Sequence, residues 1–320
     1  MLVLNVSSSS NCPSDYSLAD HVVVAKSLVG VNICASILGI LGNLLVCIAV
    51  FTTQGMTSSF HYFISSLAAA DLTVALVDQP LFITLIIARI NAKCLPDVDF
   101  AFRVVGNFAC AVSLLTLALI ALDRCLYVSP KFNYKNTMTA KKKIVLAVVW
   151  LLACVYSAIR VTLDKEITSY LTATVFGICY VEMIACYSIV YYQVFKQRKR
   201  LAASRVQNSV RTGAVEQAET LETEAENNTT ERRFARTIVM VLVVFTAGWF
   251  LLFYLRLTQP KKNYGIMYNV ARTVAFSSSS INPVLYCFNN KEYRQAFKRI
   301  SLRLFLGGPK KRREKYQRIK

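Results

Sequence analysis

The sequence has few charged residues and little of the chemistry that catalysis uses. Only 17% of its 320 residues are Asp, Glu, Lys or Arg, whereas 55% are hydrophobic, which is unsuited to a water-soluble domain. With two histidines, no metal-ligand cluster, no nucleophile–base pair and no phosphate loop, an enzyme is not expected. Eleven Gly and seven Pro exclude collagen-like or Gly/Pro-rich disordered chains, and ten Cys are too few for a disulfide scaffold.

Long apolar stretches take the place of charge. Residues 27–51 carry no charged side chain and are long enough to cross a hydrocarbon core of about 30 Å as a helix. Six further apolar segments lie at about 60–88, 98–123, 144–159, 169–195, 237–255 and 264–288. The sequence therefore predicts an all-α bundle of seven transmembrane helices over residues 27–288, preceded by segment 1–26 and followed by tail 289–320.

The distribution of basic residues predicts the orientation of this bundle. Of 37 Lys and Arg, ten fall on the side that holds the N-terminus, and the remaining 27 (37 minus 10) lie in 124–143, 196–236 and 291–320. By the positive-inside rule the N-terminus is outside and the C-terminus is cytoplasmic. The polar segment 196–236 is then the third cytoplasmic loop, expected to be helical at both ends and disordered between, and residues after 289 form an amphipathic interfacial helix.

Polar motifs within the spans resemble those of rhodopsin-like (class A) G-protein-coupled receptors. They are, in chain order, Gly42-Asn43, Leu67-Ala68-Ala69-Ala70-Asp71-Leu72, Asp123-Arg124-Cys125, Trp150, Tyr191, Phe245 with Trp249, and Asn282-Pro283-Val284-Leu285-Tyr286. Seven motifs in the family's order cover nearly the whole chain, so chance agreement is very improbable. The resemblance implies a plasma-membrane receptor with a heterotrimeric G protein, an extracellular ligand, membrane lipids and arrestin as partners, and it implies no nucleic acid.

The resemblance also implies a switch and an ion site. Asp71 with Ser113, Ser278, Ser279 and Asn282 is expected to hold an allosteric sodium ion; the alternative is a protonated Asp71 held by Ser and Asn hydrogen bonds. No other cofactor is expected.

At the cytoplasmic side, Glu231 is expected to pair with Arg124, which follows Asp123, until the span at about 237–255 swings outward. The alternative is that Glu231 and Arg124 form only a solvated surface pair. Tyr191 and Tyr286 are expected to approach each other through water in the active form, with interior packing as the alternative, and Phe132 is expected to contact the G protein. Pro283 allows helix 7 to bend.

Departures from the family pattern guide the ligand prediction. Gly106 stands where amine receptors carry Asp, which disfavours a biogenic amine, and Phe276 stands where opsins carry Lys. The outer halves of the helices instead carry basic and aromatic residues, which suit an acidic small molecule or lipid as ligand. Asp99 would favour a basic peptide. The alternative is that the arginines reach water or pair with nearby Asp. The candidate ligand residues are Asp99, Phe102, Arg103, Gly106, Asn107, Phe253, Arg256, Tyr268 and Arg272.

Three further expectations concern the outer side and the class of protein. The second outer loop, about residues 160–168, is short and contains no Cys, in the manner of melanocortin-like receptors, so the family's usual bridge to that loop cannot form. Cys12 and Cys94 are the cysteines in clearly extracellular segments, where the surroundings are oxidising, so they are expected to pair with each other. Asn5 is expected to be the glycosylated site. A seven-helix transporter or channel is the alternative class, although no repeated halves or broken helices are visible.

Overall fold

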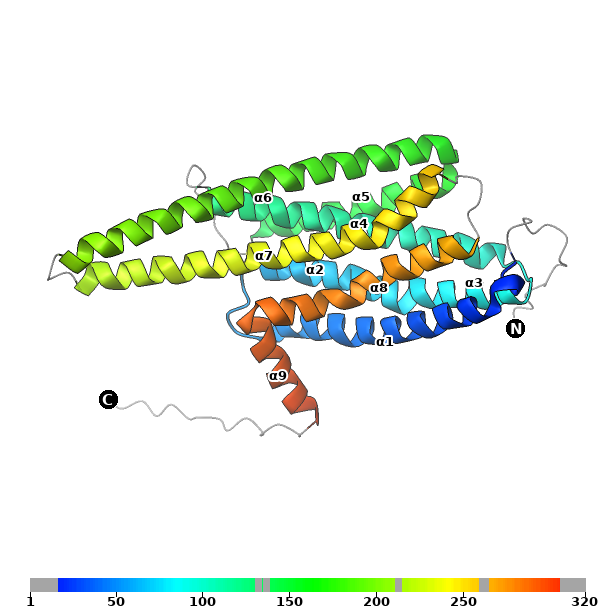
Figure 1. Cartoon of the computed structure of the whole chain (residues 1–320), viewed down its shortest axis with the longest axis horizontal. Coiled ribbons are helices and arrows are strands. Elements are labelled where there is room, and N and C mark those ends of the chain that lie inside the picture. Colours follow the sequence, from blue (N-terminus) through cyan, green and yellow to red (C-terminus); the bar gives the residue numbers. More distant parts are fainter. Residues whose placement is uncertain (1–16, 130–133, 135–138, 211–214, 259–264, 306–320) are drawn as a thin grey trace.

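A computed structural model describes residues 17–129, 134, 139–210, 215–258 and 265–305. All the regular elements in these ranges are helical, and the long helices lie side by side in one bundle (Figure 1). They are α1 (Val22–Thr52, after a short turn η1, Ala19–His21), α2 (Ser59–Thr73), the π-helical turn η2 (Val74–Asp78), α3 (Gln79–Ile90), α4 (Pro96–Val128), α5 (Ala140–Thr162), α6 (Lys165–Val210), α7 (Val215–Thr258), α8 (Ile266–Asn289) and α9 (Lys291–Phe305).

Seven of these helical runs correspond to the seven predicted spans, because α2, η2 and α3 form one continuous rod from residue 59 to residue 90. Among the described residues, six runs are long and apolar enough to cross a membrane by composition. The seventh, α8, carries Arg272 and several Ser and Asn, and it packs between α1 and α7. A helix this polar can lie within a membrane when its polar side chains face other helices.

The predicted helical ends of the third cytoplasmic loop are long. Helix α6 continues to Val210 and α7 begins at Val215, so only residues 211–214 of the predicted loop 196–236 lie outside the described helices. The segment contains no Pro and is rich in Ala, Glu, Gln, Lys and Arg, which have strong intrinsic helix propensity. Polarity indicated that the segment leaves the membrane, but it did not indicate that the helices end there.

The second outer connection is even shorter than predicted. Helix α5 ends at Thr162 and α6 begins at Lys165, so two residues, Leu163 and Asp164, join them. Arg160 and Thr168, the expected limits of this loop, both lie within helices.

The predicted amphipathic helix after the last span is α9, which leaves the bundle at an angle (Figure 1). Tyr293 and Ile300 are buried on its inner face, as the sequence pattern predicted. His61 of α2 holds the start of α9: its Nε2 lies 3.1 Å from Oε2 of Glu292 and its Nδ1 lies 3.1 Å from the hydroxyl of Tyr293. The hydrogen bond with His61 lowers the pKa of Glu292.

A close approach between α1 and α8 explains the Gly42-Asn43 motif. A Cβ added to Gly42 would lie 2.8 Å from Cγ of Pro283, so any larger residue would push the two helices apart. Beside this contact, Nδ2 of Asn43 donates to the backbone oxygen of Ser279 at 3.2 Å. The two residues therefore set the distance and the register of α8 against α1.

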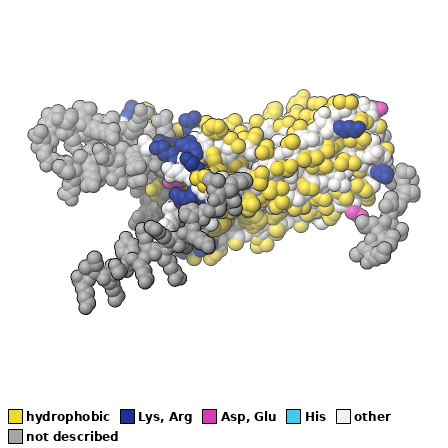
Figure 2. Space-filling view, turned by 90° about the horizontal axis from the view of Figure 1, so that it is seen from below, with side chains coloured by type: hydrophobic (Ala, Val, Ile, Leu, Met, Phe, Trp, Pro, Cys, Tyr) yellow, Lys and Arg dark blue, Asp and Glu magenta, His cyan; other side chains and the backbone are white. Residues whose placement is uncertain are grey.

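The outer surface of the bundle has the distribution that a bilayer requires. Figure 2 shows a broad band of hydrophobic side chains along the bundle and a group of Lys and Arg near the end from which α9 departs. Apolar side chains of α1 and α5 such as Leu38, Leu41, Ile144 and Leu151 are more than half exposed on this surface. The end with the basic group is the one that the charge distribution assigns to the cytoplasm.

Candidate functional site

The middle of the bundle contains a buried carboxylate at Asp71. Its side chain is 2% exposed, and its Oδ2 accepts a hydrogen bond from Nδ2 of Asn282 at 2.8 Å. The hydroxyl of Ser279 also hydrogen-bonds to it. Two of the four residues predicted to surround Asp71 therefore contact it directly.

The other two predicted partners are buried in the same interior. Ser278 donates its hydroxyl proton to the backbone oxygen of Ala275 at 2.6 Å, which leaves its oxygen lone pairs available. Ser113 is 5% exposed. Carboxylate and hydroxyl oxygens are the ligands that hard cations such as sodium prefer, so the donor set fits the predicted ion. The same hydrogen bonds from Asn282 and Ser279 also fit the alternative of a protonated Asp71.

At the cytoplasmic end, Asp123 of α4 is held from four directions. Its oxygens accept hydrogen bonds from the hydroxyl of Ser59 at 2.8 and 3.0 Å and from the hydroxyl of Tyr134 at 2.7 Å, and the amine of Lys142 lies 3.2 Å away. The fourth partner is Arg124, whose guanidinium forms an ion pair with Asp123. Asp123 thus joins α2, α4, α5 and the segment between α4 and α5.

Arg124 is folded inward and is 1% exposed. Its guanidinium carbon lies 5.3 Å from the ring centroids of both Phe60 and Tyr127, so it is sandwiched between aromatic side chains. The Asp123–Arg124 ion pair is therefore buried. The side chain of Glu231 on α7, and Phe132, lie outside the described residues, so their roles stay predictions.

The predicted switch residue Tyr191 lies on the outer surface of the bundle in this structure. Tyr191 is 45% exposed on the apolar surface, whereas Tyr187, one helical turn earlier, is 6% exposed and close enough for the charge of Arg124 to act on it. The spacing of buried residues in α6, Cys179, Met183, Tyr187 and Val190, would have indicated the inward face. Tyr187 is thus the tyrosine of this part of α6 that faces the interior here, and the approach of Tyr191 to Tyr286 in the active form stays a prediction.

The remaining predicted switch residues that the structure describes are buried or partly buried in the bundle. Tyr286 is fully buried, and neither its hydroxyl nor that of Tyr187 has a hydrogen-bond partner among the described residues. Phe245 and Trp249 of α7 pack with ring centroids 5.9 Å apart. Helix α7 carries Leu251 where the family has Pro, and the structure places no Pro within it.

The outer end contains a second buried network, which the sequence did not reveal. Arg89 of α3 is fully buried; one of its NH groups donates to Oδ1 of Asn269 at 2.9 Å and another lies 3.4 Å from Oδ1 of Asp99. Arg103 approaches the same carboxylate at 3.2 Å. The acid predicted to bind a basic peptide is therefore paired with two arginines of the chain itself, as the alternative had proposed.

Gly106 leaves room for an acid of a neighbouring helix. A Cβ on Gly106 would lie 3.1 Å from Oδ2 of Asp78, a fully buried residue at the end of the π-helical turn. The cation that acts on Asp78 is Arg272 of α8, whose guanidinium carbon lies 5.3 Å from the ring centroid of Phe102. The sequence had placed no carboxylate at Gly106, and the fold brings one there from η2.

Aromatic residues form the wall of this outer cluster. Phe82, Phe102 and Phe276 pack against one another with centroids 5.4 to 5.8 Å apart. Tyr268 donates its hydroxyl proton to the backbone oxygen of Leu255 at 2.9 Å, so its main contact is structural. Asn107 is half-buried on α4, and the side chains of Phe253 and Arg256 lie outside the described residues.

The predicted extracellular modifications are only partly described. Cys94 is disulfide-bonded, and eight other cysteines in the described part of the chain are free thiols. Cys12 and Asn5 lie outside the described residues, so the pairing of Cys12 with Cys94 and the glycosylation of Asn5 stay predictions.

A seven-helix membrane bundle with a buried Asp-Asn centre and a buried Asp-Arg pair at one end is the architecture of a seven-transmembrane receptor. The model of the rhodopsin family of seven-transmembrane receptors matches residues 42–166 and 159–286. The chain therefore belongs to this family. It is a membrane receptor of the G-protein-coupled class and not an enzyme, and the family implies an extracellular ligand and coupling to a G protein in general.

Individual relatives differ in the ligands that their names state. Melanocortin receptor 5 of Rattus norvegicus is 25% identical over 92% of this chain and 88% of its own length. Sphingosine 1-phosphate receptor 1 of Danio rerio is 24% identical over 87% and 78%, and a D(5)-like dopamine receptor of Takifugu rubripes is 26% identical over 87% and 67%. Squid rhodopsin shares the fold, with a TM-score of 0.77 at 18% identity over 96% of this chain and 94% of its own.

Proposed function

We propose that this chain is a plasma-membrane receptor that binds an extracellular ligand at its outer end and promotes nucleotide exchange on a heterotrimeric G protein by outward movement of α7. The observation that carries the proposal is the burial of Arg124 beneath the cytoplasmic surface. An arginine that is 1% exposed and paired with Asp123 cannot contact a partner protein in this conformation. The conformation is therefore one of two states, and ligand binding favours the state in which Arg124 is released.

The outer cluster supports an anionic group on the ligand. Arg89, Arg103 and Arg272 stand against Asp78 and Asp99, so three positive charges face two negative charges. Arg103 is 47% exposed and is the arginine best placed to meet an incoming ligand. An acidic small molecule, an acidic lipid or a peptide with an acidic side chain would supply the missing negative charge. Arg103→Gln should then weaken the response to such a ligand without changing basal exchange.

A sodium ion at Asp71 is the proposed allosteric effector. The residues that would hold it are Asp71, Ser113, Ser278, Ser279 and Asn282, and the bound ion would supply the positive charge that a buried carboxylate otherwise lacks. Sodium should raise the melting temperature of the purified receptor relative to potassium, and Asp71→Asn should remove the difference. Equal melting temperatures in the two salts for the unaltered chain would favour a protonated Asp71.

The direct test of the receptor proposal is nucleotide exchange on purified G proteins of each subtype, with the chain in lipid nanodiscs. Arg124→Ala should abolish exchange, and Glu231→Gln should raise it if Glu231 helps to hold Arg124. Ionic current through the reconstituted chain, with no exchange on any G protein, would refute the proposal in favour of a channel. Unchanged exchange in Glu231→Gln together with its loss in Arg124→Ala would mean that Asp123 alone holds Arg124.

The basic residues of α9 and of the cytoplasmic loops complete the proposed docking surface. Lys291, Arg294, Lys298 and Arg299 lie on the outer side of α9, where they suit anionic lipid headgroups as well as a G protein or arrestin.

A further inference from the structure

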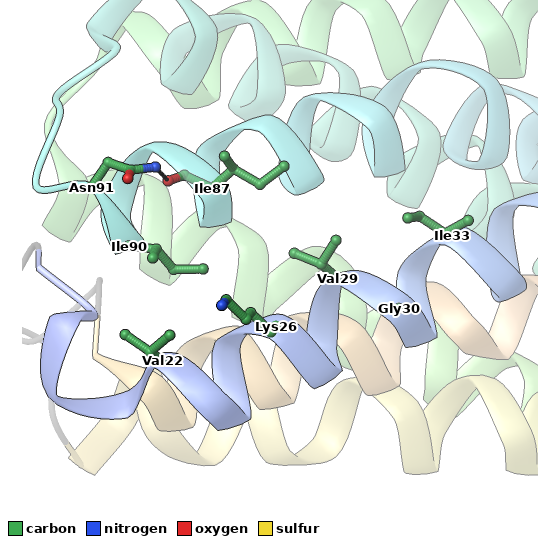
Figure 3. Close-up of a pocket in the computed structure, with 8 residues that line it drawn as sticks. All are labelled: Val22, Lys26, Val29, Gly30, Ile33, Ile87, Ile90 and Asn91. Atoms are coloured by element: carbon green, nitrogen blue, oxygen red, sulfur yellow. Dashed lines mark hydrogen bonds between the residues drawn. The ribbon is translucent and has the colours of Figure 1, made fainter.

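A groove of about 550 Å³ lies between the outer halves of α1 and α3, on the side of the bundle (Figure 3). Its walls are aliphatic: Val29 and Ile33 come from α1, and Ile87 and Ile90 come from α3. Ile33 is 45% exposed and Ile87 is 47% exposed, so both face the surroundings of the bundle. The groove belongs to the apolar belt and is separate from the buried Asp99 and Asp78 network.

Gly30 keeps the groove open at its centre. A Cβ built on Gly30 would meet no atom within 4 Å, so the absence of a side chain there is not required by packing between the helices. In Figure 3 the side chains of α1 on either side of Gly30 frame a space that a larger residue would fill. A helix interior is a position where Gly costs about 1 kcal/mol relative to Ala, and an empty groove is the feature that this Gly provides.

One charged side chain reaches into this aliphatic groove. Lys26 lines it together with Val22, one turn from the outer end of α1 (Figure 3). Among the described residues, Lys26 forms no ion pair. Asn91 lies beside it at the end of α3, where one N–H of its amide donates to the backbone oxygen of Ile87 at 2.8 Å. Its second N–H is left for another acceptor.

The depth of these groups matches the layers of a lipid. Helix α1 has 31 residues, or about 46 Å at 1.5 Å per residue, which exceeds a hydrocarbon core of about 30 Å by roughly 8 Å at each end. Lys26 is about 6 Å from the outer end and therefore lies at the level of the headgroups. Val29, Gly30 and Ile33 follow below it, at the level of the acyl chains.

We propose that the groove between α1 and α3 is a binding site for a membrane phospholipid, whose phosphate pairs with Lys26 and whose acyl chain lies along Gly30. Lys26 supplies the charge complementary to a phosphodiester, and Asn91 supplies a further donor. The aliphatic walls of the groove replace the contacts that the acyl chain would make with other lipids. The site is independent of the ligand and the G protein proposed above.

The test is native mass spectrometry of the purified full-length chain in detergent, titrated with palmitoyl-oleoyl phosphatidylglycerol and with the matching phosphatidylcholine. Lys26→Gln should weaken the first binding event for phosphatidylglycerol about fivefold, the effect expected of one basic residue at a membrane surface. Gly30→Leu should weaken the binding of both lipids, because its side chain fills the groove. Lys26→Arg should retain binding.

Two matched controls separate the groove from unspecific effects. Lys93→Gln removes a charge at the same end of the bundle, and Gly177→Leu places the same side chain at another exposed helical glycine whose added Cβ meets no atom within 4 Å. Both should bind lipid as the unaltered chain does. Equal affinities in Lys26→Gln and Lys93→Gln, or in Gly30→Leu and Gly177→Leu, would overturn the proposal. A dimer mass that the groove variants abolish, in place of a lipid adduct, would assign the groove to a second copy and also overturn it.

Discussion

Tyr134→Phe tests whether the partners of Asp123 restrain Arg124. The hydroxyl of Tyr134 donates to the buried carboxylate of Asp123 at 2.7 Å, and a hydrogen bond to a charged group contributes about 1.5–3 kcal/mol. Burial and the bond to Asp123 raise the pKa of Tyr134, so it remains a neutral donor at physiological pH. Since Tyr134 is half-buried, water replaces part of the lost bond, and a net loss of about 1 kcal/mol is expected.

This loss applies to the conformation in which Asp123 holds Arg124, so it should shift the equilibrium toward the released conformation. About 1 kcal/mol corresponds to a roughly fivefold change in the ratio of the two states. Basal nucleotide exchange on a purified G protein should therefore rise several-fold in Tyr134→Phe. Tyr170→Phe, which removes a hydroxyl from a side chain that is 77% exposed, serves as the control.

The reasoning would be refuted if Tyr134→Phe left basal exchange at the level of the control while the melting temperature fell. The hydrogen bond from Tyr134 to Asp123 would then stabilise both conformations equally. Asp123 would serve only to hold α2, α4 and α5 together. Ser59→Ala distinguishes the two cases further, because it removes a second donor to the same carboxylate from another helix. An effect in Ser59→Ala alone would mean that the position of α2, and not the number of donors, governs Arg124.

Gly42→Ala should lower the melting temperature, because its Cβ would meet Pro283 at 2.8 Å and overpacking costs about 1–3 kcal/mol, whereas Gly177→Ala should not lower it. Tyr191→Phe should lower ligand-stimulated exchange if the exposed Tyr191 turns inward toward Tyr286 in the active form, and exchange equal to that of the unaltered chain would contradict the assignment made from sequence. Asn5→Gln should remove the mobility shift that glycosidase produces, and a residual shift would contradict the orientation. Mass spectrometry of the unreduced protein should find Cys12 joined to Cys94, and free thiols at both would disprove that pairing.

The hydrophobic pattern and the charge distribution of the sequence were sufficient to predict the seven-helix bundle and its terminal amphipathic helix. A run of some 20 apolar residues has one stable arrangement in a bilayer, because backbone hydrogen bonds must be satisfied within the segment, so residues 27–51 had to form a helix wherever they packed. The amphipathic pattern after residue 289 predicted α9 in the same way. The resemblance to rhodopsin-like receptors identified Asp71, Asn282 and the Asp123-Arg124 pair, and Asp71 and Asn282 were also conspicuous as polar groups within apolar spans.

Most contacts between helices could not be predicted from the sequence, although the contact of Asn282 with Asp71 was expected. The partners of Asp123 lie 64 residues before it and 11 and 19 residues after it, and nothing in the local pattern of Ser59, Tyr134 or Lys142 marks them as neighbours of one carboxylate. Asp78 reaches the space beside Gly106 only because the π-helical turn lies at that point of the rod. Only the structure shows that Tyr187 is buried while Tyr191 is exposed here, since residues one turn apart can differ in burial wherever a long helix leaves the core. These features depend on how rigid helices rotate and slide against one another, which is set by the sum of many small packing contacts and by no single residue.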